Sequence, residues 1–458
     1  MTTIPSLREV TAAAGLSAAD VANWADSAPS PEPKFDPAVA ATGGFLSRGG
    51  DLLGALPEPA GRSESERAAA EAIADALNGA RDDFLAAHAT ELYARITDGY
   101  RKPVRLEQLV LQAAALVPGL TPTREQLAAE RDRRLADKEG IELAQGLLAS
   151  RVLAAPKPGR HLLETMLLPT PEAVQRLDEL RETGNVDFGF AHVARRGRVG
   201  ILEIRNPRHL NAEDGLTLPP TEWAVDLILL DPEIEVGVIR GGLVDQPKYA
   251  GERVFSSGIN LTHLYLGRID FLFYLIRDLA YVNKLYRGVG TPAGPVEKLW
   301  IAAVERFAIG GGCQLLHVVD HVIAGRGSRL YLPARKEGII PGASNLRLPR
   351  FVGDRAARQA ILSGREWTAG DPDADLICDE VVDPGEVDTA LEARVQALTS
   401  SGLINAAANR RALRVGQEPL ELFREYMATY AREQAYCHLS PALVANLETH
   451  WNAHQRSI

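Results

Sequence analysis

From Ser63 to about residue 185, apolar and polar positions alternate with a helical period, whereas residues 1 to about 60 show little sustained periodicity and are expected to form short helices or irregular structure. This period predicts helices at residues 63–100, 106–117, 121–153 and from residue 170 onward. Ser63 and Glu66 have the spacing of a capping box, and Pro122 is expected at the first position of the third helix. Residues 1–185 are therefore predicted to form an all-helical N-terminal extension, which packs or stabilises an oligomer rather than carrying chemistry.

From about residue 186 the apolar period shortens to that of β-strands. Strands are predicted at residues 188–195, 199–205, 236–241, 300–304 and 322–324, with helices at 223–230 and 270–286. A turn at Arg196-Gly197 is expected to join the first two strands. This alternation predicts an α/β core at residues 186–355, followed by a mostly helical C-terminal region at residues 356–458.

Composition and charge narrow the possible classes of protein. The chain has 458 residues, 46% of them hydrophobic and 24% charged, as in globular proteins of more than one domain. Its net charge of −10 argues against non-specific nucleic-acid binding. The three cysteines lie far apart and are expected to be free thiols in a reducing compartment. With no signal-peptide pattern and no apolar run of membrane-spanning length, we expect a cytoplasmic protein without a membrane partner.

Three consecutive glycines, Gly310 to Gly312, stand between a predicted strand and a short apolar helix. Glycine lets the backbone approach another group closely. The free N–H groups at the start of a helix can point at an anion or at a developing oxyanion. Because glycine runs are often only turns, this feature gains weight only from the sequence around it.

The stretch from Phe307 to Gly342, FAIGGGCQLLHVVDHVIAGRGSRLYLPARKEGIIPG, resembles the signature of the crotonase (enoyl-CoA hydratase/isomerase) superfamily. An upstream segment at residues 253–261, RVFSSGINL, resembles the part of that family that supplies the other half of an oxyanion hole. The resemblance extends from about residue 186 to the C-terminus and implies a crotonase-type ββα spiral core with C-terminal helices that pack across a trimer interface. It implies an oxyanion hole formed by the N–H groups of Ile259 and Gly311.

The same resemblance implies further substrate contacts. The neighbouring substrate-binding positions are Gly258, Asn260, Leu261 and Gly312. Residues 206–212 resemble the loop that holds the adenine end of CoA. Hydratases of the family use two glutamates, but the corresponding positions here are Gln314 and Ala334, which exchange no proton near neutral pH. Hydration is therefore not expected, although Asp270 or Glu337 could still supply a carboxylate for an isomerase.

Particular substitutions resemble the dioxygenase branch of the superfamily, which acts on 3,5-dihydroxyphenylacetyl-CoA in glycopeptide-antibiotic biosynthesis. The resemblance implies that Glu213, Arg277 and Gln314 bind the ring hydroxyls, and that Ile339 and Ile340 lie near O2. It implies no cofactor beyond O2 as co-substrate and CoA as part of the substrate, and a homo-oligomer that is a trimer or a dimer of trimers. Glu213 is expected in the first turn of a helix.

Two questions stay open at this point. The first is Arg277, which lies among apolar residues. Binding of a ring hydroxyl explains it as well as a purely structural role, in which it snorkels or pairs with Asp278 or another acid. The second is function, since a conventional crotonase (isomerase, hydratase or thioesterase) and a non-catalytic acyl-CoA-binding protein remain alternatives. No metal site is expected: His317 and His321 are four residues apart, but the crotonase resemblance implies that His321 starts a buried strand, so the two would not share a helix face. No Rossmann fingerprint indicates a flavin or a nicotinamide.

Overall fold

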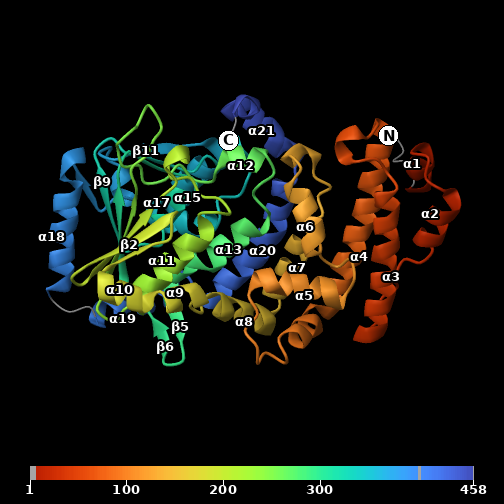
Figure 1. The fold of residues 1–458 in the computed structure, drawn as a ribbon, viewed down its shortest axis with the longest axis horizontal. Helices are drawn as coiled ribbons and strands as arrows, with labels where there is room; N and C mark the ends of the chain where they lie inside the picture. The colour runs from red at the N-terminus through yellow and green to blue at the C-terminus, as the bar shows by residue number, and fades with distance from the viewer. Residues whose placement is uncertain (1–6, 401–403, 457–458) are drawn as a thin grey trace. The chain divides into compact units, whose positions relative to one another are not determined.

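The computed structural model describes residues 7–400 and 404–456 and divides into two compact units (Figure 1). Unit 1 takes Met1–Leu162, Tyr265–Leu272 and Met427–Val444. Unit 2 takes Leu163–Leu264, Phe273–Tyr426 and Ala445–Ile458. Each unit therefore combines segments that are distant in sequence. The three-part division into residues 1–185, 186–355 and 356–458 stays a prediction of how the chain is organised in sequence.

Unit 1 is helical where it is described. Its helices are α1 Leu7–Ala13, α2 Ala18–Ala25, α3 Phe35–Gly54, α4 Glu64–Ile96, α5 Leu106–Leu116, α6 Arg124–Arg131 and α7 Leu143–Ala154. The predicted capping box is confirmed: the Ser63 hydroxyl accepts a hydrogen bond from the Glu66 N–H, and the Glu66 carboxylate accepts one from the Ser63 N–H. Trp24 stacks on Phe45 at 5.0 Å between ring centroids in the apolar core of this unit.

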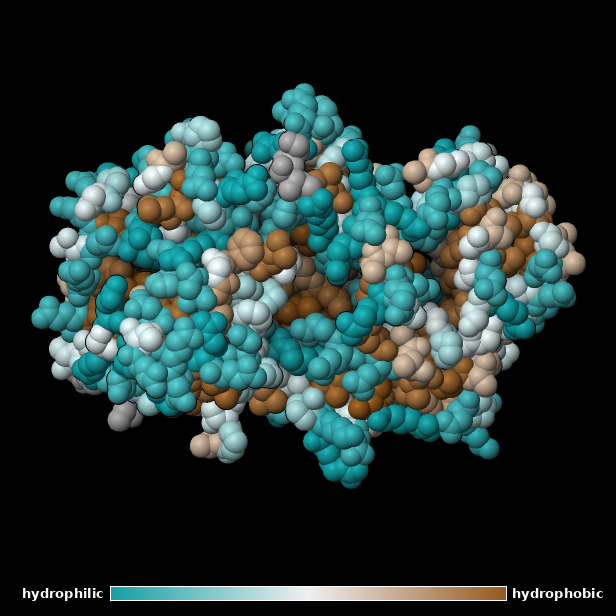
Figure 2. All heavy atoms as spheres, in the orientation of Figure 1, coloured by the Kyte–Doolittle hydropathy of each residue, from teal (hydrophilic) through white to brown (hydrophobic). Residues whose placement is uncertain are grey.

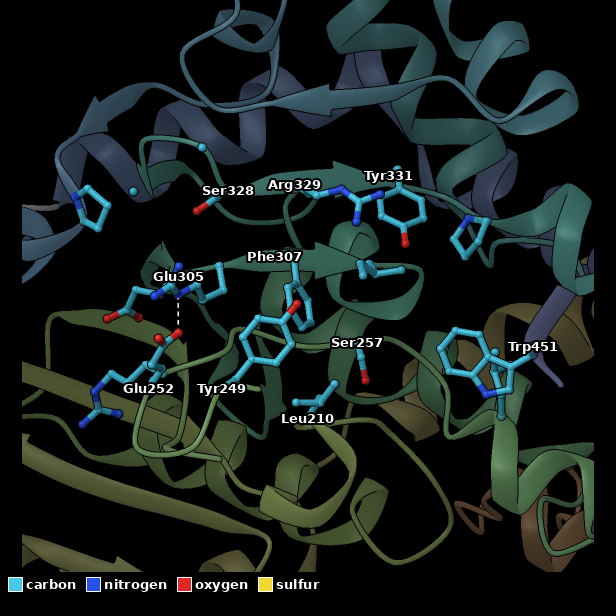
Figure 3. Close-up of a pocket in the computed structure, with 18 of the residues that line it drawn as sticks. Leu210, Tyr249, Glu252, Ser257, Glu305, Phe307, Ser328, Arg329, Tyr331 and Trp451 are labelled. Carbon is cyan, nitrogen blue, oxygen red and sulfur yellow. Dashed lines mark ion pairs between the residues drawn. The ribbon is translucent and has the colours of Figure 1, made fainter. Parts of the chain in front are cut away.

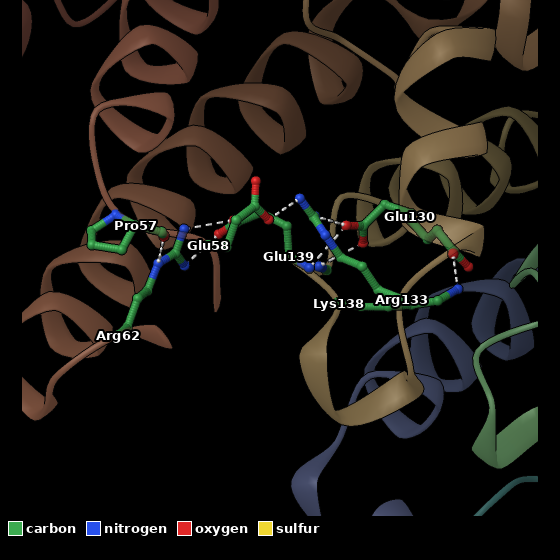
Figure 4. A network of polar contacts seen from close by, with 9 residues as sticks. Pro57, Glu58, Arg62, Glu130, Arg133, Lys138 and Glu139 are labelled. Atoms are coloured by element: carbon green, nitrogen blue, oxygen red, sulfur yellow. Dashed lines mark hydrogen bonds and ion pairs between the residues drawn. The ribbon is translucent and has the colours of Figure 1, made fainter. Parts of the chain in front are cut away.

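The predicted helix at residues 121–153 is wrong in its start and in its continuity. Thr123 and Gln126 form the capping box of α6, so Pro122 lies outside the helix. The buried carboxylate of Glu130, in the last turn of α6, accepts hydrogen bonds from the N–H groups of Glu139 and Gly140, which folds the chain back before α7. Ion pairs hold this connection, among them Arg62 with Glu139, whose closest atoms are 2.7 Å apart (Figure 4).

Unit 2 is built around a seven-stranded sheet in the order β1-β2-β3-β4-β7-β9-β12. Its strands are β1 Asn185–Asp187, β2 Ala191–Arg196, β3 Val199–Ile204, β4 Val236–Gly241, β7 Leu299–Val304, β9 His321–Gly325 and β12 Glu380–Val382. The first three strands are antiparallel, and the pairs from β3 to β12 are parallel. The predicted α/β class is therefore confirmed, as is the hairpin turn, where Arg196 pairs with Val199 and Gly197 has φ 59°.

Helices and a second sheet complete this unit. The second sheet has the order β11-β10-β8, with β8 Phe307–Ile309, β10 Arg329–Tyr331 and β11 Glu366–Thr368, and β5 Val289–Thr291 pairs with β6 Gly294–Val296. The helices are α9 Pro171–Gln175, α10 Leu177–Thr183, α11 Leu218–Leu230, α12 Leu261–Tyr265, α13 Leu272–Leu279, α14 Tyr281–Arg287, α15 Gly311–Leu315, α16 Ala334–Glu337, α17 Ser344–Arg358, α18 Val387–Thr399 and α19 Ile404–Gln417. Like α12 and α13, each of which has one residue in unit 1, three more helices have residues in both units: α8 Pro156–Met166, α20 Leu420–His438 and α21 Pro441–Trp451.

The helix predicted at residues 270–286 is divided in two. Ala280, with φ −100° and ψ −103°, separates α13 from α14. Both pieces remain deeply buried, so the break changes the direction of the chain without exposing it. It lets side chains from the two pieces meet at the candidate site described below.

A buried glutamate fixes the C-terminal helices of unit 2. Glu418, directly after α19, contacts Arg287, Arg347 and Arg350, with closest distances of 3.1, 2.9 and 2.9 Å. Burial alone would raise the pKa of the Glu418 carboxyl, but the arginines, Arg347 most of all, lower it to about 2. Because this pKa is below the ordinary value, the ion pairs between Glu418 and the arginines stabilise the fold above pH 4.5, and this stabilisation is lost as the pH falls towards 2.

We expect Glu418→Gln to lower the free energy of unfolding by about 3–5 kcal/mol at neutral pH, since it leaves buried arginines without their acid. The difference from wild type should shrink as the pH falls below the ordinary glutamate pKa of 4.5. Urea unfolding across this pH range measures it. Asp354→Asn, which removes the exposed partner of Arg358, is the control, with an expected change of at most about 1 kcal/mol.

The visible face of the molecule is mostly hydrophilic, with scattered hydrophobic patches (Figure 2). Among the described residues, no helix combines the length and the apolar character needed to cross a membrane.

Candidate functional site

The loop at Gly258 lies directly against the glycine run. A Cβ atom at Gly258 would lie 2.8 Å from the Ile309 carbonyl oxygen and 3.2 Å from the Gly311 nitrogen, and Gly258 has φ +86°. Only glycine fits this close approach of two backbones. The Ile309 N–H donates to the Ser256 carbonyl at 3.0 Å, which pairs the two segments. The structure therefore brings together the two segments that the sequence analysis assigned to one oxyanion hole.

The backbone N–H groups of Ile259 and Gly311, one from each segment, have no hydrogen-bond acceptor in the part of the chain that the structure describes. The Glu213 backbone hydrogen-bonds to the residues on either side of Ile259. Its N–H donates to the Gly258 carbonyl at 2.7 Å, and its carbonyl accepts from the Asn260 N–H at 2.8 Å. Gly311 is the first residue of α15, where helix geometry leaves the N–H without an acceptor. The pair can stabilise negative charge on one oxygen.

A buried polar cluster lies next to these amides, centred on Arg277 of α13. Its Nε is 3.1 and 3.0 Å from the two carboxylate oxygens of Glu213, and its Nη2 donates to the Gly311 carbonyl at 2.8 Å. Its Nη1 donates to Asp278 at 3.2 Å and to the Gln314 Oε1 at 2.9 Å. The structure therefore shows that Arg277 forms ion pairs with acids, and its binding of a ring hydroxyl stays a prediction.

The position of Glu213 differs from the prediction. It lies outside any helix, in an isolated parallel bridge with Ile259, because α11 begins only at Leu218. Its carboxylate also accepts a hydrogen bond from the Tyr281 hydroxyl, and a Cβ atom at Gly311 would lie 2.0 Å from its Oε2. The bridge thus turns Glu213 towards the glycine run. Tyr281 was missed in the sequence, although its position four residues after Arg277 would have placed the two side chains on one face of the predicted helix.

Burial sets the protonation of this cluster. It disfavours the charged form of Arg277, but the facing Glu213, with Tyr281 and Asp278, raises the pKa of the guanidinium above its ordinary value. Burial raises the pKa of Asp278, against the opposing charge of Arg277. It also raises the pKa of Tyr281 well above the ordinary value. The cluster therefore keeps its cation, and Tyr281 keeps the proton that it donates to Glu213.

A cavity of about 680 Å³ lies in unit 2 beside the two loops (Figure 3). Leu210, Ser257, Leu261 and Ile309 connect it to the oxyanion segments, and the lining includes the predicted substrate-binding residue Leu261, Leu210 of the predicted CoA loop and the alternative carboxylate Glu337. Other lining side chains are Tyr249, Phe307, Tyr331, Trp451 and Arg329. The cavity thus adds residues from distant segments, such as Trp451, which no local sequence motif could have placed there.

Most cationic side chains of the cavity are paired. Arg253 pairs with Glu203, Arg306 with Glu252 (dashed in Figure 3), Arg326 with Asp383 and Arg329 with Glu366. Lys336 has no ion-pair partner within the described ranges. An anionic ligand would therefore find Lys336 without competition from a protein carboxylate.

The two candidate histidines do not form a metal site. His321 begins β9, as predicted, whereas His317 is buried after α15 with its Nδ1 3.0 Å from the Ser344 hydroxyl. Burial lowers the pKa of His317 to about 3, so it stays neutral. In residues 7–400 and 404–456, no group of three or more His, Cys, Asp or Glu side chains could hold a metal ion.

The remaining predicted residues lie close by. Asn260 donates through its side chain to Asp214 at 3.0 Å, and Gly312 packs on Ser256. Ile339 follows α16, is half-buried and does not line the cavity. Of the two alternative carboxylates, Asp270 belongs to unit 1, where it pairs with Arg131. Glu337 lines the cavity of unit 2.

Comparison with known proteins adds independent information. The sequence model of the family described as enoyl-CoA hydratase/isomerase matches residues 198–432. The (3,5-dihydroxyphenyl)acetyl-CoA 1,2-dioxygenase of Amycolatopsis orientalis is 48% identical over 390 residues, which are 84% of this chain and 89% of the relative. A probable enoyl-CoA hydratase of Rhizobium meliloti (strain 1021) is 28% identical over 42% of this chain and 68% of the relative. A carnitinyl-CoA hydratase structure from Mycobacterium avium superposes with a TM-score of 0.47 and 22% identity, covering 59% of this chain and 98% of that chain.

Proposed function

Because this chain belongs to the enoyl-CoA hydratase/isomerase family, the crotonase superfamily, we propose that it is a dioxygenase acting on an arylacetyl-CoA. It converts 3,5-dihydroxyphenylacetyl-CoA and O2 to 3,5-dihydroxyphenylglyoxylate and free CoA, without a metal ion or an organic cofactor. Similarity to the Amycolatopsis dioxygenase over most of both chains supports this substrate. One observation carries the proposal. Among the described residues, the N–H groups of Ile259 and Gly311 have no protein acceptor and lie beside the buried Arg277 cluster.

The two amides match the charge that the reaction develops. Removal of an α-proton gives an enolate, whose oxygen accepts hydrogen bonds from the N–H groups of Ile259 and Gly311. Loss of one such donor costs roughly 3–4 kcal/mol of barrier in other enzymes. Gln314 and Ala334, at the positions where hydratases carry glutamates, leave no pair of carboxylates to add water.

The enolate and O2 are converted to products without any further reactant. The enolate gives one electron to O2, and the radical pair combines to form the α-peroxide. The distal peroxide oxygen attacks the thioester carbonyl and expels the CoA thiolate. Loss of the second α-proton, with cleavage of the O–O bond, gives the glyoxylate, and the thiolate takes up one proton. Ile339 and Ile340 are proposed as apolar neighbours of O2.

The polar cluster supplies groups for a hydroxylated ring. Arginine has five N–H groups. Four of those in Arg277 face Glu213, Asp278, Gln314 and Gly311, which leaves one Nη2 hydrogen for a ligand. The Gln314 side-chain NH2 also has no acceptor within the described residues. Both donors can bind phenolic oxygens, and Glu213 can accept from a phenol O–H.

CoA would occupy the cavity and the loop at residues 206–212. Leu210 of this loop lines the cavity and has φ 54°. The adjacent Asn211 holds the loop, since its Nδ2 donates to the carbonyls of Gly242 and Val254 at 2.9 and 2.7 Å. Lys336 is available for a phosphate. For the assembly we propose a trimer or a dimer of trimers.

Oxygen-electrode traces with metal-stripped protein test the proposal. We expect O2 uptake with 3,5-dihydroxyphenylacetyl-CoA that persists in chelator, and a kcat/KM lower by at least about tenfold with phenylacetyl-CoA, since buried donors would lose their partners. Turnover of an enoyl- or aryl-CoA without O2 would instead support a conventional crotonase. Tight ester binding with no product by mass spectrometry would support a binding protein.

A further inference from the structure

Glu337 differs from the other carboxylates that line the cavity. Glu252 pairs with Arg306, and Glu305 pairs with Arg240 at 2.6 Å. The Glu337 carboxyl has neither an ion pair nor a hydrogen bond to any described residue, although the residue is only 8% exposed. A buried carboxyl that faces a cavity without a protein partner is suited to interact with a ligand.

The helix that contains Glu337 is fixed to the glycine run. Tyr331, at the end of β10, pairs in register with Ile309, and its carbonyl accepts a hydrogen bond from the Gly310 N–H at 2.9 Å. The Pro333 ring lies 3.7 Å from the position of a Cβ atom on Gly310, and α16 begins at the next residue. The position of Glu337 is thus tied to the segment that supplies the Gly311 N–H.

We propose that Glu337 is the catalytic base that removes the α-proton of the bound arylacetyl thioester. This inference rests on the proposed function. The α C–H bond breaks, an O–H bond forms on the Glu337 carboxylate, and the electron pair moves to the thioester oxygen, which accepts from Ile259 and Gly311. The proton then passes to the departing CoA thiolate, which restores the carboxylate.

The surroundings of Glu337 fit this role. Burial raises the pKa of its carboxyl to about 8. Tyr331 faces it from β10, and burial raises the pKa of that phenol too, so it stays neutral. Lys336 on its own helix and His450 of α21 line the same cavity, and the π-turn Gln359–Ser363 packed on α16 has no titratable side chain. Because the active form is the carboxylate, proton removal should accelerate as the pH rises through about 8.

Hydrogen exchange at the α-carbon, followed by NMR in D2O without O2, isolates this step. Wild type should exchange the α-hydrogens of 3,5-dihydroxyphenylacetyl-CoA, and Glu337→Gln should slow this exchange at least about 100-fold. Glu337→Asp should retain part of the rate. Arg335→Gln, on the exposed side of the same helix, is the matched control and should exchange like wild type.

The outcomes separate this inference from the proposed function. A Glu337→Gln variant that binds the ester and exchanges at the wild-type rate would overturn the role of Glu337 and leave the dioxygenase intact. So would a variant that only binds the ester more weakly but exchanges normally once saturated. A wild type that neither exchanges nor consumes O2 with any arylacetyl-CoA would overturn the proposed function itself.

A stability measurement checks the environment of Glu337 without activity. A carboxyl whose folded pKa of about 8 lies above the ordinary 4.5 loses folding free energy as the pH rises between these values. Glu337→Gln should therefore unfold at the same temperature as wild type below this range and at a higher temperature above it. A difference in Tm that does not change with pH would contradict a buried, partner-free carboxyl.

Discussion

Gly311→Ala is expected to lower kcat by about 100-fold or more, the effect of losing one oxyanion donor. A Cβ atom at this position would lie 2.0 Å from the Glu213 Oε2 and 3.2 Å from the Arg277 Nη2. The carboxylate is held on its other side by Arg277 and Tyr281, so the backbone of the glycine run must move instead. A small shift of the Gly311 N–H is enough to weaken its hydrogen bond to the enolate oxygen.

The control is Gly416→Ala on α19, where no atom lies within 4 Å of the new methyl group. Steady-state O2 uptake and thermal unfolding of both variants separate catalysis from folding. We expect Gly311→Ala to lose kcat while still binding the CoA ester, because the cavity lining does not include Gly311. Wild-type kcat in a folded Gly311→Ala protein would remove the main support for an oxyanion hole at this position.

The sequence predicted those parts of the fold that local patterns determine. The bounds of β4 agree with the prediction because this strand is buried along its whole length and begins with an apolar run that extends to Ile239. The capping box at Ser63 is likewise local. The break between α13 and α14 at Ala280 was not predictable, because alanine favours a helix and only tertiary packing opposes it. The same holds for the fold-back at Glu130, which depends on a buried carboxylate meeting distant amides.

In the candidate site too, local sequence segments were predictable and long-range contacts were not. Ile259 and Gly311 were found because each belongs to a recognisable segment, and the structure then placed the segments side by side. The mutual pairing of Arg277 and Glu213 spans 64 positions and left no local pattern in the sequence. The cavity also depends on Trp451, more than 100 residues beyond the glycine run at Gly310 to Gly312. Long-range contacts therefore decide which polar groups face the ligand and which neutralise each other.

Arg277→Met is expected to lower the free energy of unfolding of unit 2 by about 3–5 kcal/mol, the usual cost of removing one partner of a buried ion pair. Arg277 is 4% exposed, and its loss would leave the buried carboxyls of Glu213 and Asp278 without their cation. The pKa of Asp278 is already raised by burial, so this carboxyl can take up a proton when the arginine is absent. The Glu213 carboxylate keeps only the Tyr281 hydroxyl as a side-chain donor within the described residues, and it should account for most of the loss.

A double-mutant cycle with Glu213→Gln measures this share. The double variant Arg277→Met/Glu213→Gln should be less destabilised than the sum of the single variants by about 1–3 kcal/mol, because a neutral amide needs no cation. Tryptophan fluorescence during urea unfolding reports mainly on unit 2, which contains four of the five tryptophans: Trp223, Trp300, Trp367 and Trp451. Strict additivity would mean that the two side chains do not stabilise each other. A measured coupling would instead mean that Arg277 and Glu213 already form a stable ion pair before the substrate binds. A ring hydroxyl of the substrate would then hydrogen-bond to this existing pair rather than bring the two side chains together.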